Sequence, residues 1–357
     1  MRPWKWGLLI VAGISAVVIV VPMAERFIER RMAVDALARY DVDAVLDRSP
    51  DAPLLVARAA RLAEDYDRAR SALDSATEPS QEIDFERALV AAQRGQPSFA
   101  ERIIRTPWGR EPDRLADASA AVAWGYVHDH RPQLALRALD KIPPDHPFGL
   151  CARGRASIAL GNWDGALADF RAAVDLAPDF RTARFGLAEC LEHAGQPLEA
   201  VTHLVRLPAD DEVALVLAKC RIALAEPDAA MSLLNVILIR SLDHPDALLE
   251  RGRLLFRKRD FASAERDLGR LTTVAPGRLD GWLVLRSCLR EQGKDTLACD
   301  EAIRRVEADT LRVNRLLVRA GEPGADATLF REIGDGLRKV GREAEGLRWL
   351  RIAGDMP

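Results

Sequence analysis

The stretch LGNWDGALADFRAAVDLAP, residues 160–178, has the parts of a tight turn followed by one amphipathic helix. Ala166, Phe170 and Val174 recur at four-residue intervals, which places them on one face of a helix that ends at Pro178. Gly161 precedes this helix, and glycine can close the helix before it in a left-handed conformation at little steric cost. The stretch is therefore one arm of a helix-turn-helix unit.

The same unit recurs along the chain. Gly161 and Gly195 are separated by 34 residues, and so are Ala166 and Ala200. A small residue stands five places after each candidate turn, at intervals of 30 to 48 residues: Ala69, Ala100, Ala135, Ala166, Ala200, Ala230, Ala264, Ala298 and Gly346. This spacing predicts nine helical hairpins from about residue 51 to the end of the chain.

The pattern resembles the tetratricopeptide repeat (TPR). The best copies are residues 147–180, with Gly154, Gly161, Trp163, Ala166, Phe170, Ala173 and Pro178, and residues 245–278, with Gly252, Phe261, Ala264, Leu268 and Pro276. The resemblance implies an all-α superhelical array of TPR-type hairpins, an α-solenoid. It also implies that the first helix of each hairpin lines a concave groove that binds an extended peptide or a helix of a partner protein, with no catalysis and no cofactor.

An apolar segment precedes the repeats. Residues 7–24 contain no charge over 18 residues, which corresponds to about 27 Å of helix, close to the hydrocarbon thickness of a bilayer. Trp4 and Trp6 stand at its entry, where interfacial anchors lie. The segment predicts one uncleaved transmembrane helix and a single-pass membrane protein, with the repeat domain expected on the extracytoplasmic side.

The chain is therefore expected to have six parts. These are a membrane anchor with its flanks (1–31), a connecting helix (32–50), divergent TPR-like hairpins (51–146), a TPR array (147–311), a linker (312–326) and a terminal TPR-like hairpin (327–357). The linker is predicted because the interval from Ala298 to Gly346 exceeds a 34-residue repeat by 14 residues and contains Gly321, Pro323 and Gly324.

Motifs for chemistry are not found. The sequence lacks phosphate-binding glycine loops, the nucleophile elbow G-x-S-x-G, the H-E-x-x-H pair and any C-x-x-C. His128-Asp129-His130 offers too few placed ligands for a metal, and the five cysteines are expected to be buried free thiols. A net charge of −3, with acids and bases alternating along the chain, gives no field that would attract nucleic acid.

The alignment of first helices suggests a binding surface. The residue after the small position is Arg155, Glu189, Lys219, Arg253 and Ser287 in five successive hairpins, and in the TPR family this position points into the groove. Arg257 and Arg290 follow one turn further along the same helices, so a moderately cationic strip is expected through the middle and later repeats. The candidate partner-binding residues are Arg155, Glu189, Lys219, Arg253, Arg257 and Arg290, although such arginines can equally neutralise nearby acids on a solvated surface.

Two classes of function remain open. The first is a membrane-tethered TPR scaffold or adaptor that binds a partner protein or peptide in its groove. The second is a permanently bound accessory or regulatory subunit of a membrane enzyme or export complex. Catalysis by the chain itself would need a polar constellation that the sequence does not contain, so it is not expected to be an enzyme.

Overall fold

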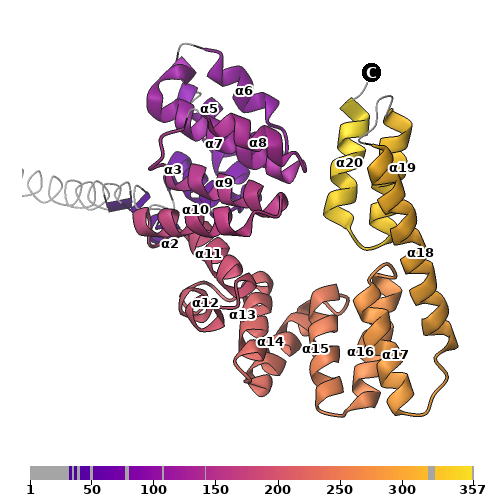
Figure 1. The fold of residues 1–357 in the computed structure, drawn as a ribbon. Helices are drawn as coiled ribbons and strands as arrows, with labels where there is room; N and C mark the ends of the chain where they lie inside the picture. The colour runs from indigo at the N-terminus through magenta and orange to yellow at the C-terminus, as the bar shows by residue number, and fades with distance from the viewer. Residues whose placement is uncertain are drawn as a thin grey trace, which may run out of the picture. The chain divides into compact units, whose positions relative to one another are not determined.

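The computed structural model describes residues 32–33, 36–37, 41–48, 51–76, 80–106, 108–140, 142–320 and 326–355. All regular structure in these ranges is helical, which confirms the predicted all-α array of hairpins (Figure 1). Helix α2 (Val42–Arg48) comes first. The next hairpins are α3 (Pro53–Leu62) with α4 (Tyr66–Asp74), α5 (Gln81–Gln93) with α6 (Ser98–Ile104), and, after the short 3-10 turn η1 (Trp108–Arg110), α7 (Pro112–His128) with α8 (Pro132–Leu139).

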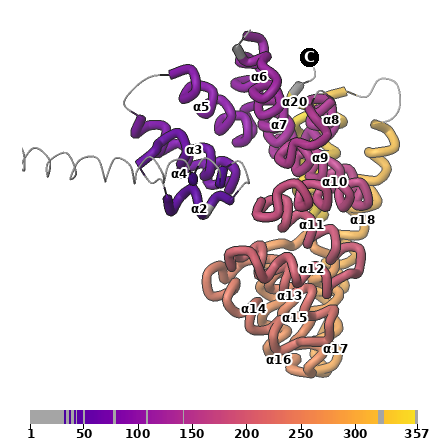
Figure 2. Tube along the Cα trace, turned by 90° about the vertical axis from the view of Figure 1, so that its left-hand side faces the viewer, coloured from indigo at the N-terminus to yellow at the C-terminus, as the bar shows by residue number. Residues whose placement is uncertain are grey.

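The later hairpins follow the same order of first and second helix, and the trace in Figure 2 shows the short turns between them. They are α9 (Pro147–Ala159) with α10 (Trp163–Leu176), α11 (Arg181–His193) with α12 (Pro197–Leu204), α13 (Asp211–Ala223) with α14 (Pro227–Arg240), α15 (Pro245–Arg257) with α16 (Phe261–Val274), α17 (Leu279–Glu291) with α18 (Leu297–Arg319), and α19 (Ala327–Lys339) with α20 (Glu343–Asp355).

One backbone feature closes the first helix of every hairpin. The residue five places before each small position has a positive φ: Glu64, Gly95, His130, Gly161, Gly195, Ala225, Arg259, Gly293 and Gly341. The next residue donates its N–H to the carbonyl four residues before the left-handed one, as Asn162 does to Ser157 at 2.8 Å and Arg342 to Leu337 at 2.9 Å. This pattern is the Schellman motif, which satisfies the last carbonyls of a helix. The predicted turns are thus present even where the left-handed residue is not glycine.

Small residues let the two helices of a hairpin approach. Gly154 of α9 lies against the ring of Phe170, and a Cβ placed on it would be only 2.7 Å from Phe170 Cε2. Gly252 of α15 faces Leu268 in the same way, at 2.7 Å from Cγ. Phe170 and Leu268 are fully buried. The turn positions and these contacts give the same register from one repeat to the next.

The chain divides into two compact units, each with its own core. The first unit comprises Met1–Gly125, Ala135–Gly154 and Ala168–Arg184. Its core includes three aromatic rings: the ring centres of Trp124 and Phe148 lie 5.4 Å apart, and those of Phe148 and Phe180 lie 6.4 Å apart. The second comprises Tyr126–Leu134, Arg155–Leu167 and Phe185–Pro357. Its main core joins helices α13 to α18 through residues such as Leu234, Ile237, Leu248, Leu268 and Leu271.

First helices of successive hairpins pack directly on one another. In the first unit α3 contacts α5, and in the second unit α13 contacts α15 and α15 contacts α17. Second helices such as α14 pack between two first helices, here α13 and α15, whereas the last one, α20, packs against α19. Side chains on neighbouring first helices therefore share one surface, which is the surface that the TPR resemblance assigns to binding.

The eighth hairpin departs from the expected register. Ala298 is exposed, and the neighbouring Cys299 is buried at the start of α18 instead. The turn from Gln292 to Thr296 is longer here than in other hairpins, so α18 begins four residues after the left-handed Gly293, whereas most second helices begin two residues after theirs. All five cysteines of the chain are free and buried, as expected.

The segments expected at 32–50 and 312–326 also differ from prediction. Asp41 lies outside a helix and α2 begins after it, so the connecting segment is not one continuous helix. The expected linker is helical up to Arg319, because α18 continues for 23 residues and uses Val313 and Leu316 to pack against α19. Much of the 14-residue excess of this interval over a 34-residue repeat therefore lengthens helix α18.

The predicted localisation must be corrected. No helix in the described part of the chain has both the length and the apolar character needed to cross a membrane. The segment 7–24, on which the prediction of a transmembrane anchor rested, lies outside the described residues. A single-pass membrane protein with an extracytoplasmic repeat domain is thus not supported.

Candidate functional site

The first unit contains a cleft bounded by three successive first helices, α3, α5 and α7. Its volume is about 510 Å³. The apolar lining residues are Leu37, Leu62 and Phe85, and the charged ones are Arg58, Arg61, Glu82, Glu86, Glu111, Asp113, Arg114 and Asp117. Five carboxylates against three guanidinium groups give the cleft an acidic balance.

A buried ion-pair network forms one wall of the cleft. Glu86 of α5 accepts hydrogen bonds from Arg58 Nε at 2.9 Å and from Arg61 Nε at 2.9 Å, both on α3. The side chains of Glu86 and Arg61 are only 2% and 3% exposed. Arg58 also donates to Glu82 at 2.7 Å. Since two charges this deeply buried are costly unless paired, the network fixes α3 against α5 and holds this wall rigid.

The opposite wall is built by α7. Arg114 donates to Glu82 at 3.0 Å and is also paired with Glu111, so it connects α7 to α5. Asp117, one turn further along α7, lies 3.2 Å from His146 Nε2. Burial alone would raise the pKa of Asp117, but the hydrogen bond from His146 and the positive charges of Arg61, His146 and Arg58 lower it instead. Asp117 is thus a carboxylate at neutral pH.

The rim of the cleft remains open to solvent. Glu111 and Asp113 are exposed at the N-terminal end of α7. Carboxylates at this end of a helix are favoured by the partial positive charge of the helix dipole. A ligand entering the cleft would meet these two acidic side chains first.

The residues predicted from the sequence lie on the first helices of the second unit. Arg155 donates to Glu189 at 2.6 Å, and its guanidinium carbon lies 5.5 Å from the centre of the Phe185 ring. Lys219 is half-buried on α13. The pair of Arg155 and Glu189 therefore joins α9 to α11, and its charges are neutralised within the protein.

Further along, arginine and carboxylate pairs connect α15 with α17. Arg253 donates to Glu250 at 2.9 Å and to Asp280 at 3.4 Å. Arg278 donates to Asp246 at 2.6 Å and to Asp280 at 3.1 Å. The predicted cationic strip is thus interrupted at Arg253, which takes part in contacts between repeats.

Arg257 and Arg290 differ from the other candidates. Both are exposed, and neither forms an ion pair with another described residue. They stand near the C-terminal ends of α15 and α17, where a positive charge is favoured by the helix dipole. Lys219 also forms no ion pair with another described residue but is half-buried, so of the six predicted residues Arg257 and Arg290 present their charge to solvent most openly.

The sequence analysis missed the cleft in the first unit. Arg58 and Arg61 are three residues apart, as are Glu111 and Arg114, and Glu82 and Glu86 are four apart, so each pair shares one face of its helix. These charged pairs on three consecutive first helices were a usable signal. The divergent repeats before residue 147 retain few TPR signature residues, so the family pattern assigned no binding residues to them.

Comparison with known proteins identifies the repeat family. A family model described as tetratricopeptide repeat matches residues 151–214 and 249–310. These two ranges are tetratricopeptide repeats. The matched ranges include the second helix of one hairpin together with the first helix of the next, as in α10 with α11 and α16 with α17. A TPR scaffold is suited to binding a protein or peptide partner.

Individual relatives are distant. The probable magnetosome protein Mms48 of Magnetospirillum gryphiswaldense is 32% identical over 85 residues, which are 24% of this chain and 19% of that protein. Among solved structures, that of MamA is 16% identical and covers 44% of this chain and 96% of its own, with a TM-score of 0.39. PilF of Pseudomonas aeruginosa is 16% identical, covers 63% of this chain and 97% of its own, and has a TM-score of 0.45.

Proposed function

We propose that this TPR protein is a non-enzymatic scaffold that holds an extended segment of a partner protein against the inner surface of its first helices. The cleft between α3, α5 and α7 is the main contact in this proposal. Its apolar residues suit side chains of a peptide, and its charged walls suit the polar backbone and basic side chains. The acidic balance of the cleft disfavours phosphate groups, so the partner is a protein rather than a nucleic acid.

The rigid ion-pair network is the observation that carries the proposal. Glu86 is held by two arginines from the neighbouring helix, so the wall needs no rearrangement before a ligand binds. A preorganised surface avoids part of the entropy cost of association. The exposed Glu111 and Asp113 then select a segment that carries Lys or Arg at the cleft entrance.

A peptide library displayed on phage, selected on the full chain, tests this function. The selected peptides should be enriched in basic residues, and the double variant Glu111→Lys and Asp113→Lys should weaken their binding by about tenfold, or about 1.4 kcal/mol. The matched control is Asp67→Lys with Asp74→Lys, which makes the same charge change on exposed positions of α4. Equal binding to both variants would place the ligand elsewhere.

Arg257 and Arg290 form a second proposed contact, for an acidic part of the same partner. Their reversal to Glu should reduce binding of a full-length partner, once one is identified from the selected peptides, while helical content stays unchanged. The control is the reversal of Arg68 and Arg105, which are exposed on α4 and at the end of α6. A partner that is recovered only in a stoichiometric, salt-resistant complex would instead favour a permanently bound accessory subunit.

A further inference from the structure

The long helix α18 exposes a line of residues spaced by seven. Leu297, Arg304, Leu311 and Val318 stand at intervals of seven along the helix. The three apolar members are exposed to 57%, 59% and 71%. The buried side of the same helix uses other residues, such as Val306, Val313 and Leu316. The exposed line is therefore additional to the face that packs in the solenoid.

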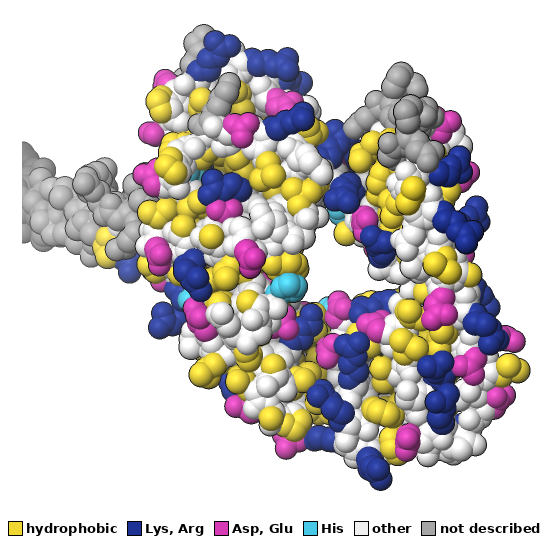
Figure 3. All heavy atoms as spheres, in the orientation of Figure 1, with side chains coloured by type: hydrophobic (Ala, Val, Ile, Leu, Met, Phe, Trp, Pro, Cys, Tyr) yellow, Lys and Arg dark blue, Asp and Glu magenta, His cyan; other side chains and the backbone are white. Residues whose placement is uncertain are grey.

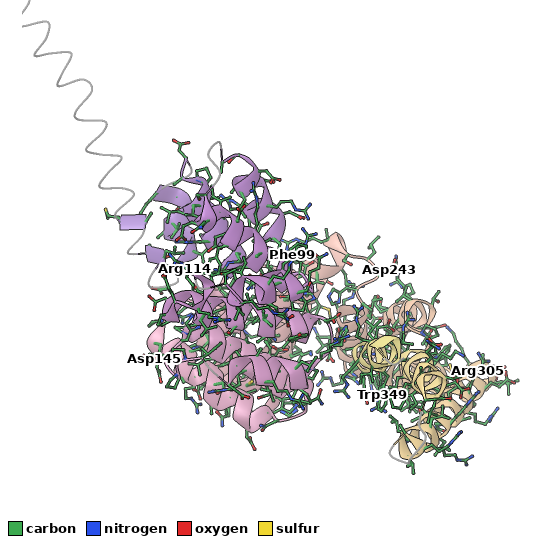
Figure 4. The ribbon with its side chains drawn as sticks, turned by 90° about the horizontal axis from the view of Figure 1, so that it is seen from above. Phe99, Arg114, Asp145, Asp243, Arg305 and Trp349 are labelled. Carbon is green, nitrogen blue, oxygen red and sulfur yellow. The ribbon has the colours of Figure 1, made fainter. Side chains whose placement is uncertain are left out.

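Arginines border one side of this line. Arg305, Arg312 and Arg319 form a parallel row one residue further on, and Arg315 lies beside them. All four are exposed, and none forms an ion pair with another described residue. At the start of the same helix, by contrast, Asp300 is paired with Arg286 at 3.2 Å. Arg305 extends away from the helices in Figure 4, and dark blue side chains follow the edge of the molecule where α18 lies in Figure 3.

The spacing indicates what kind of surface fits this face. Residues seven apart drift by only about 20° around a straight helix, so the apolar line and the arginine row run nearly parallel to the helix axis. From Arg305 to Arg319 the row is about 21 Å long at 1.5 Å per residue. Side chains at seven-residue intervals are the contacts that one helix offers to another in a coiled coil.

We propose that this face of α18, called here the arginine face and defined by Leu297, Arg304, Arg305, Leu311, Arg312, Arg315, Val318 and Arg319, docks an acidic amphipathic helix of a partner protein. The partner's apolar residues contact Leu311 and Val318, and its Glu or Asp side chains pair with the flanking arginines. A second copy of this chain does not fit, because two arginine faces repel each other. A phosphate backbone would leave the apolar line without a counterpart.

Two synthetic peptides test the proposal with the full chain. The probe is a fluorescent 21-residue helical peptide with Leu at seven-residue intervals and Glu on both sides of the leucine line. The control peptide has the same composition in scrambled order. Fluorescence anisotropy should show that the ordered peptide binds at least about tenfold more tightly than the scrambled one. Binding should weaken as salt is added, because the arginines are exposed.

Variants then locate the site. Arg305→Glu, Arg312→Glu and Arg319→Glu together should abolish binding of the ordered peptide, and Leu311→Ser with Val318→Ser should weaken it about fivefold or more, since each exposed apolar contact contributes modestly. The matched control is Arg68→Glu, Arg70→Glu and Arg105→Glu, which changes the charge equally on exposed positions of the first unit. Circular dichroism verifies that each variant is folded.

Several outcomes would overturn the proposal. They are absence of binding, equal binding of the scrambled peptide, equal loss in the control variant, and no effect of the changes at Leu311 and Val318. A further outcome concerns RNA. If a fluorescent RNA duplex binds the wild-type chain but not the arginine variant, and the acidic peptide does not bind, the face is a nucleic-acid surface instead. The change of Glu111 and Asp113 in the cleft should leave peptide binding to α18 intact, so this proposal and the proposed function fail independently.

Discussion

The fit between Gly154 and Phe170 yields a quantitative prediction about how the hairpins pack. An alanine at position 154 would place its Cβ 2.7 Å from Cε2 and 2.9 Å from Cζ of Phe170, well inside carbon contact distance. Phe170 has no exposed surface, so its ring has little room to move away. Alanine would favour the helix by about 1 kcal/mol, and overpacking costs about 1–3 kcal/mol. Gly154→Ala alone should therefore destabilise the hairpin by up to about 2 kcal/mol.

A smaller residue at position 170 should reverse this effect. The next hairpin has Ala188 and Leu204 at the corresponding positions, both buried. In a Phe170→Leu background the clash disappears and Gly154→Ala should stabilise by up to about 1 kcal/mol. The two changes should thus show a coupling free energy of about 1–3 kcal/mol in favour of the double variant.

Hydrogen exchange of the amides in α9 and α10, measured by mass spectrometry, is the suitable assay, because repeat arrays open locally. Gly269→Ala is the control, since a Cβ there meets no atom within 4 Å. This control should stabilise α16 by about 1 kcal/mol in either background. Additive effects of Gly154→Ala and Phe170→Leu, within about 0.5 kcal/mol, would refute the steric argument.

Three further predictions concern turns, buried charge and thiols. Ala225→Gly should stabilise and Gly161→Ala should destabilise by about 1 kcal/mol each in thermal unfolding, because both positions have a positive φ; changes of equal sign would contradict this. Glu86→Gln should lower the free energy of unfolding in urea by about 3 kcal/mol, whereas the change at the more exposed Glu82, Glu82→Gln, should lower it by less than about 1 kcal/mol. Similar losses in the two variants would show that burial of the ion pair matters little. Burial raises the pKa of Cys190 to about 12, so its thiol should react with a disulfide reagent at pH 8 only after unfolding, and rapid labelling of the folded chain would disprove this.

The hairpin array could be predicted from the sequence because its determinants are local. A turn residue, a small residue five places later and an apolar stripe at helical spacing act within one repeat, so counting along the chain located even the turns at Glu64, Ala225 and Arg259, where no glycine marks the position. Side-chain size at Gly154 and Phe170 likewise follows from the pattern of a single hairpin. The shifted register at Cys299 escaped prediction, because it depends on the length of one irregular turn.

The binding surfaces were decided by the tertiary structure. Arg58 and Glu86 are 28 residues apart, and Arg253 and Asp280 are 27 apart, so their pairing depends on how one hairpin is rotated against the next. A local pattern shows which face of a helix a charge occupies but not which charge on the neighbouring helix meets it. For this reason the sequence left open whether these arginines form a moderately cationic strip or neutralise nearby acids, whereas in the folded chain Arg253 is paired with Glu250 and Asp280 and a cleft forms in the repeats whose signature is weakest.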